Sequence, residues 1–117
     1  MEFKEEIDQN LQNKEVSRWW NHPRNIRWDN FYYSDENKDK FHVWTRMQKS
    51  LNYLDSLNLP KGSKVLELGF GGGQMANEIL GRGYKYDGID ISEQLCKAAK
   101  NRSIEFVEKG LASFQVG

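Results

Sequence analysis

Residues 65 to 73 read VLELGFGGG, an apolar stretch that runs directly into a cluster of glycines. A short run of β-compatible residues that ends in glycines is typical of a buried strand followed by a tight turn. Glycine lacks a Cβ and adopts positive φ, so the backbone between Gly69 and Gly73 can approach a ligand where a side chain would collide. The sequence therefore predicts a strand over Val65–Leu68 that leads into a ligand-binding turn.

Helix-like and strand-like stretches alternate after this turn. The spacing predicts a helix over Gln74–Leu80, and Ser92 is the expected N-cap of a second helix. Two further strands are expected over Tyr84–Asp90 and Ile104–Val107. Strands that alternate with short helices pair in parallel through right-handed crossovers. The expected fold class is α/β, with the order β-α-β-α-β in a three-layer, Rossmann-like sheet.

The composition changes near residue 60. Ten aromatic residues lie before this point, and the glycine clusters lie after it. The elements expected in the first part are a weakly amphipathic helix, an irregular aromatic-rich segment and an amphipathic helix, over residues 4–18, 20–34 and 37–59. We therefore divide the chain into a helical, aromatic-rich N-terminal extension, residues 1–59, and the first half of a Rossmann-like domain, residues 60–117.

The composition also limits the classes of partner. Lys+Arg and Asp+Glu both number 17, so no single-sign field is expected to gather nucleic acid or an anionic membrane. Cys96 is the single cysteine, and His22 and His42 have no metal-ligand spacing, so we expect neither a disulfide nor a metal site. No run of 18 apolar residues occurs, and the first ten residues are acidic and polar. A cytoplasmic protein that binds neither membrane nor nucleic acid is expected.

Two carboxylates accompany the glycine turn. Glu67 stands near the end of the first strand, and Asp90 ends the second, where an acceptor can bind both ribose hydroxyls of an adenosine. The dinucleotide motif G-x-G-x-x-G would need glycine or alanine where this chain has Gln74, and no P-loop lysine follows Gly73. Glu67 would repel a pyrophosphate and favour a cationic ligand. The pattern indicates a nucleoside site that prefers a positively charged cofactor.

Two stretches, VLELGFGGG and YDGIDISEQLCKAAK, resemble the first two motifs of class I S-adenosylmethionine-dependent methyltransferases. The resemblance covers about residues 60 to 107, and SRWW before the long helix is similar to small-molecule methyltransferases of quinone biosynthesis. It implies S-adenosylmethionine as the cofactor and a small molecule as the methyl acceptor. The cofactor-binding residues that it implies are the two acids, the glycine turn and their neighbours: Glu67, Gly69, Phe70, Gly71, Gly73, Asp90 and Ile91.

The resemblance also implies a role for each position. Glu67 helps to hold the amino group of the cofactor, and the glycines line its methionine part. Asp90 binds the ribose, and Ile91 packs on the adenine. Methyl transfer is an in-line displacement at an activated methyl group, so alignment and exclusion of water suffice and no catalytic residue is assigned.

Two features depart from the family's pattern. After its third strand the family commonly has Gly-Asp, whereas positions 108–111 read EKGL, so Leu111 could not accept the hydrogen bond of the adenine amine. The family's sheet has seven strands, and three are expected here. We therefore expect an incomplete sheet and a fragment or degenerate homologue that is inactive alone. Self-association is expected through the exposed edge of Val65–Leu68.

The sequence leaves alternatives for the role of the aromatic segment and for the function. The aromatic residues of the N-terminal segment form either a lid over the methyl-transfer site or a cover on the sheet. Cys96 is expected in the core. The alternatives to a methyltransferase are a nicotinamide-binding oxidoreductase and a non-catalytic interaction module of the same fold.

Overall fold

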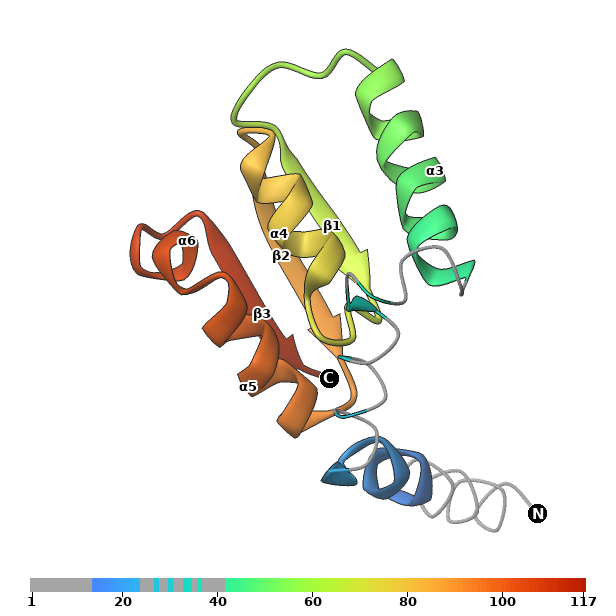
Figure 1. Cartoon of the computed structure of the whole chain (residues 1–117). Coiled ribbons are helices and arrows are strands. Elements are labelled where there is room, and N and C mark those ends of the chain that lie inside the picture. Colours follow the sequence, from blue (N-terminus) through green and yellow to red (C-terminus); the bar gives the residue numbers. More distant parts are fainter. Residues whose placement is uncertain (1–13, 24–26, 28–29, 31–32, 35, 37–41) are drawn as a thin grey trace, which may run out of the picture.

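The computed structural model describes residues 14–23, 27, 30, 33–34, 36 and 42–117. Three strands form one sheet: β1 (Lys64–Leu68), β2 (Lys85–Asp90) and β3 (Ala112–Val116) (Figure 1). Their order in the sheet is β1-β2-β3, and both pairs are parallel. The expected parallel α/β sheet is confirmed, and the carboxyl ends of all three strands lie at the same end of the sheet.

Four helices are assigned beside the strands: α3 (His42–Ser56), α4 (Gln74–Gly81), α5 (Glu93–Arg102) and α6 (Ile104–Glu108). α4 packs on β2 and on α5, while α5 packs on β3, and in Figure 1 both helices lie in front of the sheet. On the uncovered face, Leu66 and Leu68 are 61% and 74% exposed. Of the three expected layers, the described residues therefore form two: the sheet and helices over one of its faces.

The position of the third strand differs from the prediction. Ile104–Val107 is not a strand, because Phe106 and Val107 both donate backbone hydrogen bonds to Ser103 O and belong to α6. A four-residue apolar run fits either a helix or a strand, so its periodicity cannot decide between them. The strand follows instead after a turn at Gly110, whose φ is 73°. There Ala112 and Phe114 alternate into the core.

The helix expected over residues 37–59 is α3, although residues 37–41 lie outside the described part of the chain. Its predicted apolar face is confirmed by Met47, Leu51 and Leu54, which are buried in the core where α3 packs on α4. The helix ends before Asn58, whose φ of 49° is left-handed. Of the helix expected over residues 4–18, the structure describes residues 14–20 as helical, and the irregular segment is described only in part.

One core joins α3 to the Rossmann-like half. Its fully enclosed members include Leu51 of α3, Ile79 of α4 and Tyr86 of β2. Cys96 is buried in the same core, as expected, and burial raises the pKa of its thiol. The division of the chain near residue 60 stays a prediction.

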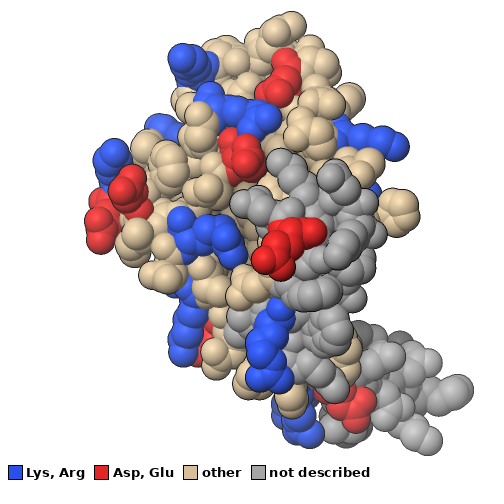
Figure 2. Space-filling view, in the orientation of Figure 1, with Lys and Arg blue, Asp and Glu red and all other residues tan. Residues whose placement is uncertain are grey.

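Charges on the described surface are mixed in sign. On the face drawn in Figure 2, lysine and arginine side chains stand beside acidic ones. Arg82 illustrates this arrangement, since its guanidinium lies 2.9 Å from Asp55 and 3.2 Å from Glu78. Within the described residues, no helix combines the length and the apolar character that crossing a bilayer requires.

Candidate functional site

The turn between β1 and α4 adopts a conformation that favours glycine. The φ angles of Gly69, Gly71 and Gly73 are 75°, 58° and 80°, all in the left-handed region. Gly73 has a second constraint, because a Cβ on it would lie 2.7 Å from the Cβ of Ala99. The third glycine therefore sets the close approach of α4 to α5, and the first two leave the backbone of the turn open.

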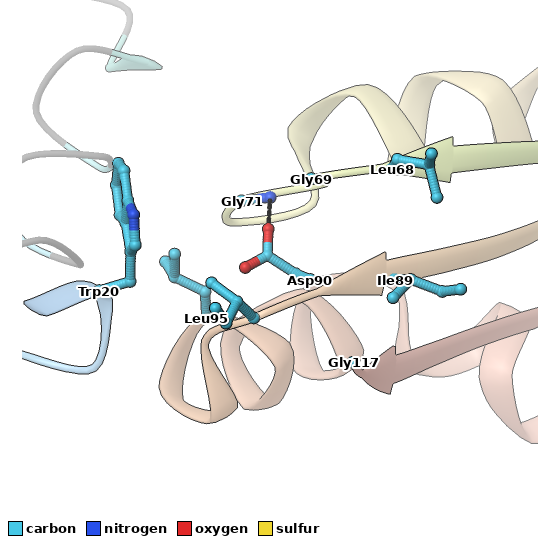
Figure 3. Close-up of a pocket in the computed structure, with 9 residues that line it drawn as sticks. Trp20, Leu68, Gly69, Gly71, Ile89, Asp90, Leu95 and Gly117 are labelled. Carbon is cyan, nitrogen blue, oxygen red and sulfur yellow. Dashed lines mark hydrogen bonds between the residues drawn. The ribbon is translucent and has the colours of Figure 1, made fainter. Parts of the chain in front are cut away.

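Asp90 ties the end of β2 to this turn. Its Oδ2 accepts a hydrogen bond from Gly71 N at 2.9 Å, drawn in Figure 3, and its Oδ1 accepts one from Ser92 N at 3.0 Å. Each carboxylate oxygen has a further lone pair, so Asp90 can accept two more hydrogen bonds in the same orientation. Two neighbouring hydroxyl groups, such as those of a ribose, match this capacity.

A cavity of about 490 Å³ opens in front of Asp90. Its walls are mainly apolar, and Figure 3 shows Trp20 facing the strand ends across it. Small-molecule sites commonly combine apolar walls with a few fixed polar groups. The lining residues are Trp20, Leu68, Gly69, Gly71, Ile89, Asp90, Ile91, Leu95 and Gly117.

A second cavity, of about 450 Å³, lies between α3 and the turn. Gly69 and Gly71 line both cavities, so the two adjoin at the turn. Two residues of opposite charge line the second cavity, Glu67 of β1 and Arg46 of α3. Burial and the neighbouring charge of Asp90 raise the pKa of Glu67, while a hydrogen bond from Tyr86 opposes this rise. The second cavity thus carries groups of both signs.

The structure distributes the seven predicted residues over three places. Asp90 and Ile91 line the first cavity, Glu67 lines the second, and Gly69 and Gly71 line both. Phe70 also borders the second cavity, but it is 5% exposed and its ring packs against Phe114 at a centroid distance of 5.2 Å. Gly73 lines neither cavity and serves the packing of α4.

Sequence reasoning missed several residues that line the two cavities. Leu68 and Ile89 stand at the predicted strand ends, so their positions carried a signal. Trp20 belongs to the aromatic segment for which a lid or a cover was expected, although its place on the first cavity was not assigned. Arg46 carried no signal, since only the tertiary fold brings it to the site. Gly117 was missed because the third strand was misplaced.

Residues 17–21 are held against the start of α5. The Ser17 hydroxyl donates to Ile91 O at 3.4 Å, and the Ser92 hydroxyl donates to Trp20 O at 3.0 Å. Gln94 N donates to the side chain of Asn21 at 3.2 Å. These contacts place Trp20 on the wall of the first cavity, which fits either of the two expected roles of the aromatic segment.

The supposed departure at Leu111 disappears with the corrected third strand. Leu111 precedes β3, at the opposite end of the sheet from Asp90. The residue that follows β3 is Gly117, whose N–H donates to Asp90 O at 2.9 Å. The reading of residues 108–111 as the family's Gly-Asp position is therefore wrong.

Comparisons with family models and with curated proteins gave no match. Among solved structures, the chain matches magnesium protoporphyrin IX methyltransferase from Synechocystis PCC 6803 with bound S-adenosylmethionine, with a TM-score of 0.69 and 21% identity, over 87% of this chain and 52% of that one. The chain therefore has a class I methyltransferase fold. A methyltransferase from Geobacter sulfurreducens in complex with S-adenosylhomocysteine is 31% identical, with a TM-score of 0.50, over 60% of this chain and 28% of that one. The chain thus spans about half the length, or less, of these methyltransferases.

Proposed function

We propose that the chain binds S-adenosylmethionine across the two adjoining cavities and takes part in the transfer of its methyl group to a small molecule. The observation that carries this proposal is the orientation of Asp90. Two backbone N–H groups fix its carboxylate at the mouth of an apolar cavity, beside a turn whose glycines leave the backbone accessible. An apolar cavity suits the adenine of an adenosine, and a fixed carboxylate beside it suits the two ribose hydroxyls.

The first cavity would take the adenosine half of the cofactor. The free lone pairs of Asp90 accept the ribose hydroxyls, and the adenine lies against Ile91 and Leu95, which line the same wall. Apolar side chains and a planar base gain from mutual burial. Trp20 faces the strand ends across the same cavity.

The second cavity would take the methionine half. This moiety carries an ammonium group and a carboxylate, and Glu67 and Arg46 supply the two complementary charges. The sulfonium is a further cation, which the nearby carboxylates favour electrostatically. Gly69 and Gly71 line both cavities, so the turn would lie between the two halves of the cofactor and would hold its sulfonium end through backbone that has no side chain at these two positions.

The role of these residues is to bind and to orient. The methyl group of a sulfonium is already activated, so the chain's contribution is to hold the cofactor while the acceptor approaches in line. A small-molecule acceptor is supported by the zero net charge and by the SRWW resemblance. The single cysteine supports the cytoplasm as the compartment, and residues 1–59 and 60–117 are proposed as extension and cofactor domain.

Calorimetric titration with S-adenosylhomocysteine tests this proposal. Asp90→Ala should raise its Kd on the order of 10- to 100-fold, because charge-assisted hydrogen bonds to the ribose are lost. Asp87→Ala is the matched control, since Asp87 lies on the same strand but pairs with Lys64 and Ser113 outside both cavities. A parallel titration with NADH tests the oxidoreductase alternative. Binding of NADH in place of S-adenosylhomocysteine, or an unchanged Kd in Asp90→Ala, would contradict the proposal.

We also propose that the free edge of β1 mediates self-association. In the described sheet β1 pairs only with β2, and its outward-facing Leu66 is 61% exposed. Unpaired strand edges with apolar side chains invite pairing with another chain. Leu66→Lys should shift sedimentation toward the monomer, whereas Leu57→Lys, at an exposed site after α3, should not. A wild-type chain that stays monomeric at all concentrations would contradict this.

A further inference from the structure

The side chain of Tyr86 makes a hydrogen bond to Glu67 that is separate from the hydrogen bonds of the glycine turn. This side chain is fully buried, on the helix-covered face of β2, and its ring packs against Phe114 at a centroid distance of 5.2 Å. The hydroxyl donates to Glu67 Oε1 at 2.6 Å. Burial and the Glu67 carboxylate raise the pKa of Tyr86, so the hydroxyl keeps its proton and remains a donor.

Gly88 makes this hydrogen bond sterically possible. It is the register partner of Glu67, two residues after Tyr86 on the same face of β2. A Cβ on Gly88 would lie 2.7 Å from the Tyr86 hydroxyl and 2.7 Å from Phe70 Cδ2. Without a side chain at this position, the Tyr86 ring lies along the sheet and reaches Glu67. A glycine and a tyrosine thus cooperate to engage one carboxylate.

The hydrogen bond leaves one oxygen of Glu67 available. Within the described residues Tyr86 is the only hydrogen-bond partner of the Glu67 carboxylate, and it uses Oε1. Glu67 lines the cavity between α3 and the turn, so Oε2 can receive a ligand there. The charged groups around it are Asp90, from β2, and Arg46, from α3.

We propose that Tyr86 is a positioning residue that fixes the Glu67 carboxylate, so that Oε2 receives the α-ammonium group of an amino-acid-bearing nucleoside. The inference rests on the proposed function and deepens it. Tyr86 itself does not touch the ligand, since it is buried behind Glu67. Its loss should therefore weaken only those ligands that carry the ammonium group, and should leave recognition of the nucleoside half unchanged.

The test compares S-adenosylhomocysteine with 5′-methylthioadenosine, which has the same nucleoside thioether but no amino-acid part. Tyr86→Phe keeps the buried ring and removes the hydroxyl. We expect its Kd for S-adenosylhomocysteine to rise roughly five- to tenfold at neutral pH, with the Kd for methylthioadenosine unchanged. Since the hydrogen bond from Tyr86 lowers the pKa of Glu67, the pH below which S-adenosylhomocysteine binding weakens should move upward in the variant.

Two companion variants separate positioning from structure. Glu67→Gln keeps an acceptor for Tyr86 but removes the charge, so adding Tyr86→Phe to it should produce little further loss. Gly88→Ala keeps both side chains but displaces the hydroxyl, so its Kd for S-adenosylhomocysteine should rise at least as much as in Tyr86→Phe, because its Cβ would also meet Phe70 of the turn. The carboxyl carbon of Glu67, followed by NMR in the unliganded chain, should titrate at higher pH in Tyr86→Phe than in the wild type.

The outcomes distinguish this inference from the proposed function. If the wild type binds S-adenosylhomocysteine and Tyr86→Phe binds it equally well at every pH, the positioning role is refuted and the proposed function stands. Equal weakening of both ligands would show a merely structural role and overturn the inference. If the wild type binds neither ligand, both proposals fail.

Discussion

Asp90 and Glu67 stand near the ends of neighbouring strands, yet the fold holds their carboxylates by different means. Asp90 accepts hydrogen bonds from two backbone N–H groups, one on each oxygen. Glu67 accepts one from a side chain, the Tyr86 hydroxyl. The orientation of Asp90 thus depends on the conformation of the turn, whereas that of Glu67 depends on the identity of residues 86 and 88. One half of the site is fixed by backbone and the other by side chains.

The largest effect should come from the turn itself. Gly73→Ala places a Cβ 2.7 Å from Ala99 Cβ at a φ of 80°, so both overpacking and backbone strain oppose it. We expect a loss of about 2–4 kcal/mol in the free energy of unfolding, measured by urea denaturation. Gly81→Ala is the control, because nothing lies within 4 Å of its Cβ position, and it should be neutral or stabilising. Equal effects of both substitutions would contradict this account of the turn.

Replacing each carboxylate by its amide tests directly whether the two are held by different means. Asp90→Asn has one acceptor oxygen for two backbone donors, so one N–H loses its partner at a cost of about 1–3 kcal/mol. Glu67→Gln still offers an oxygen to Tyr86, and its effect on unfolding should stay within about 0.5 kcal/mol. Urea denaturation of both variants measures the difference. Similar losses in the two would show that the two carboxylates are held in the same way.

The smallest effect is a pH dependence carried by Glu67. Its pKa in the folded chain is raised above the ordinary value of 4.5, mainly by burial, so the folded state holds this proton more tightly than the unfolded state does. Its contribution to stability therefore falls as the pH rises from about 4.5 through the raised pKa. The difference in unfolding free energy between wild type and Glu67→Gln should shift in favour of the variant over this window. A difference that is constant from pH 4 to 8 would contradict the raised pKa.

Short-range sequence patterns were enough to predict the part of the candidate site around the glycine turn and Asp90. The glycine turn, the N-cap at Ser92 and the acid at the end of β2 each follow from a short stretch of sequence, and the structure confirms their geometry. The Ser92 hydroxyl accepts from Leu95 N at 3.1 Å, as an N-cap does. Such features depend on residues within a few positions of each other, so no knowledge of the tertiary fold was needed.

The parts that could not be predicted depend on distant contacts. Ile104–Val107 and Ala112–Val116 are both short and apolar, and only the pairing of β3 with β2 decides which is the strand. The position of Trp20 depends on a hydrogen bond from the Ser92 hydroxyl to its backbone oxygen, and these two residues lie 72 positions apart in the sequence. The Tyr86–Glu67 hydrogen bond joins two strands whose relative register no local pattern specifies.

The Ser92 hydroxyl links the first turn of α5 to the N-terminal segment. The same oxygen accepts from Leu95 N, inside the first turn of α5, and donates to Trp20 O in the N-terminal segment. Departure of residues 17–21 would remove the acceptor that orients this hydroxyl, so the first turn of α5 should fray more readily when that segment is undocked. Amide hydrogen exchange at Leu95, which lines the same cavity, would then report the opening of the cavity wall at Trp20.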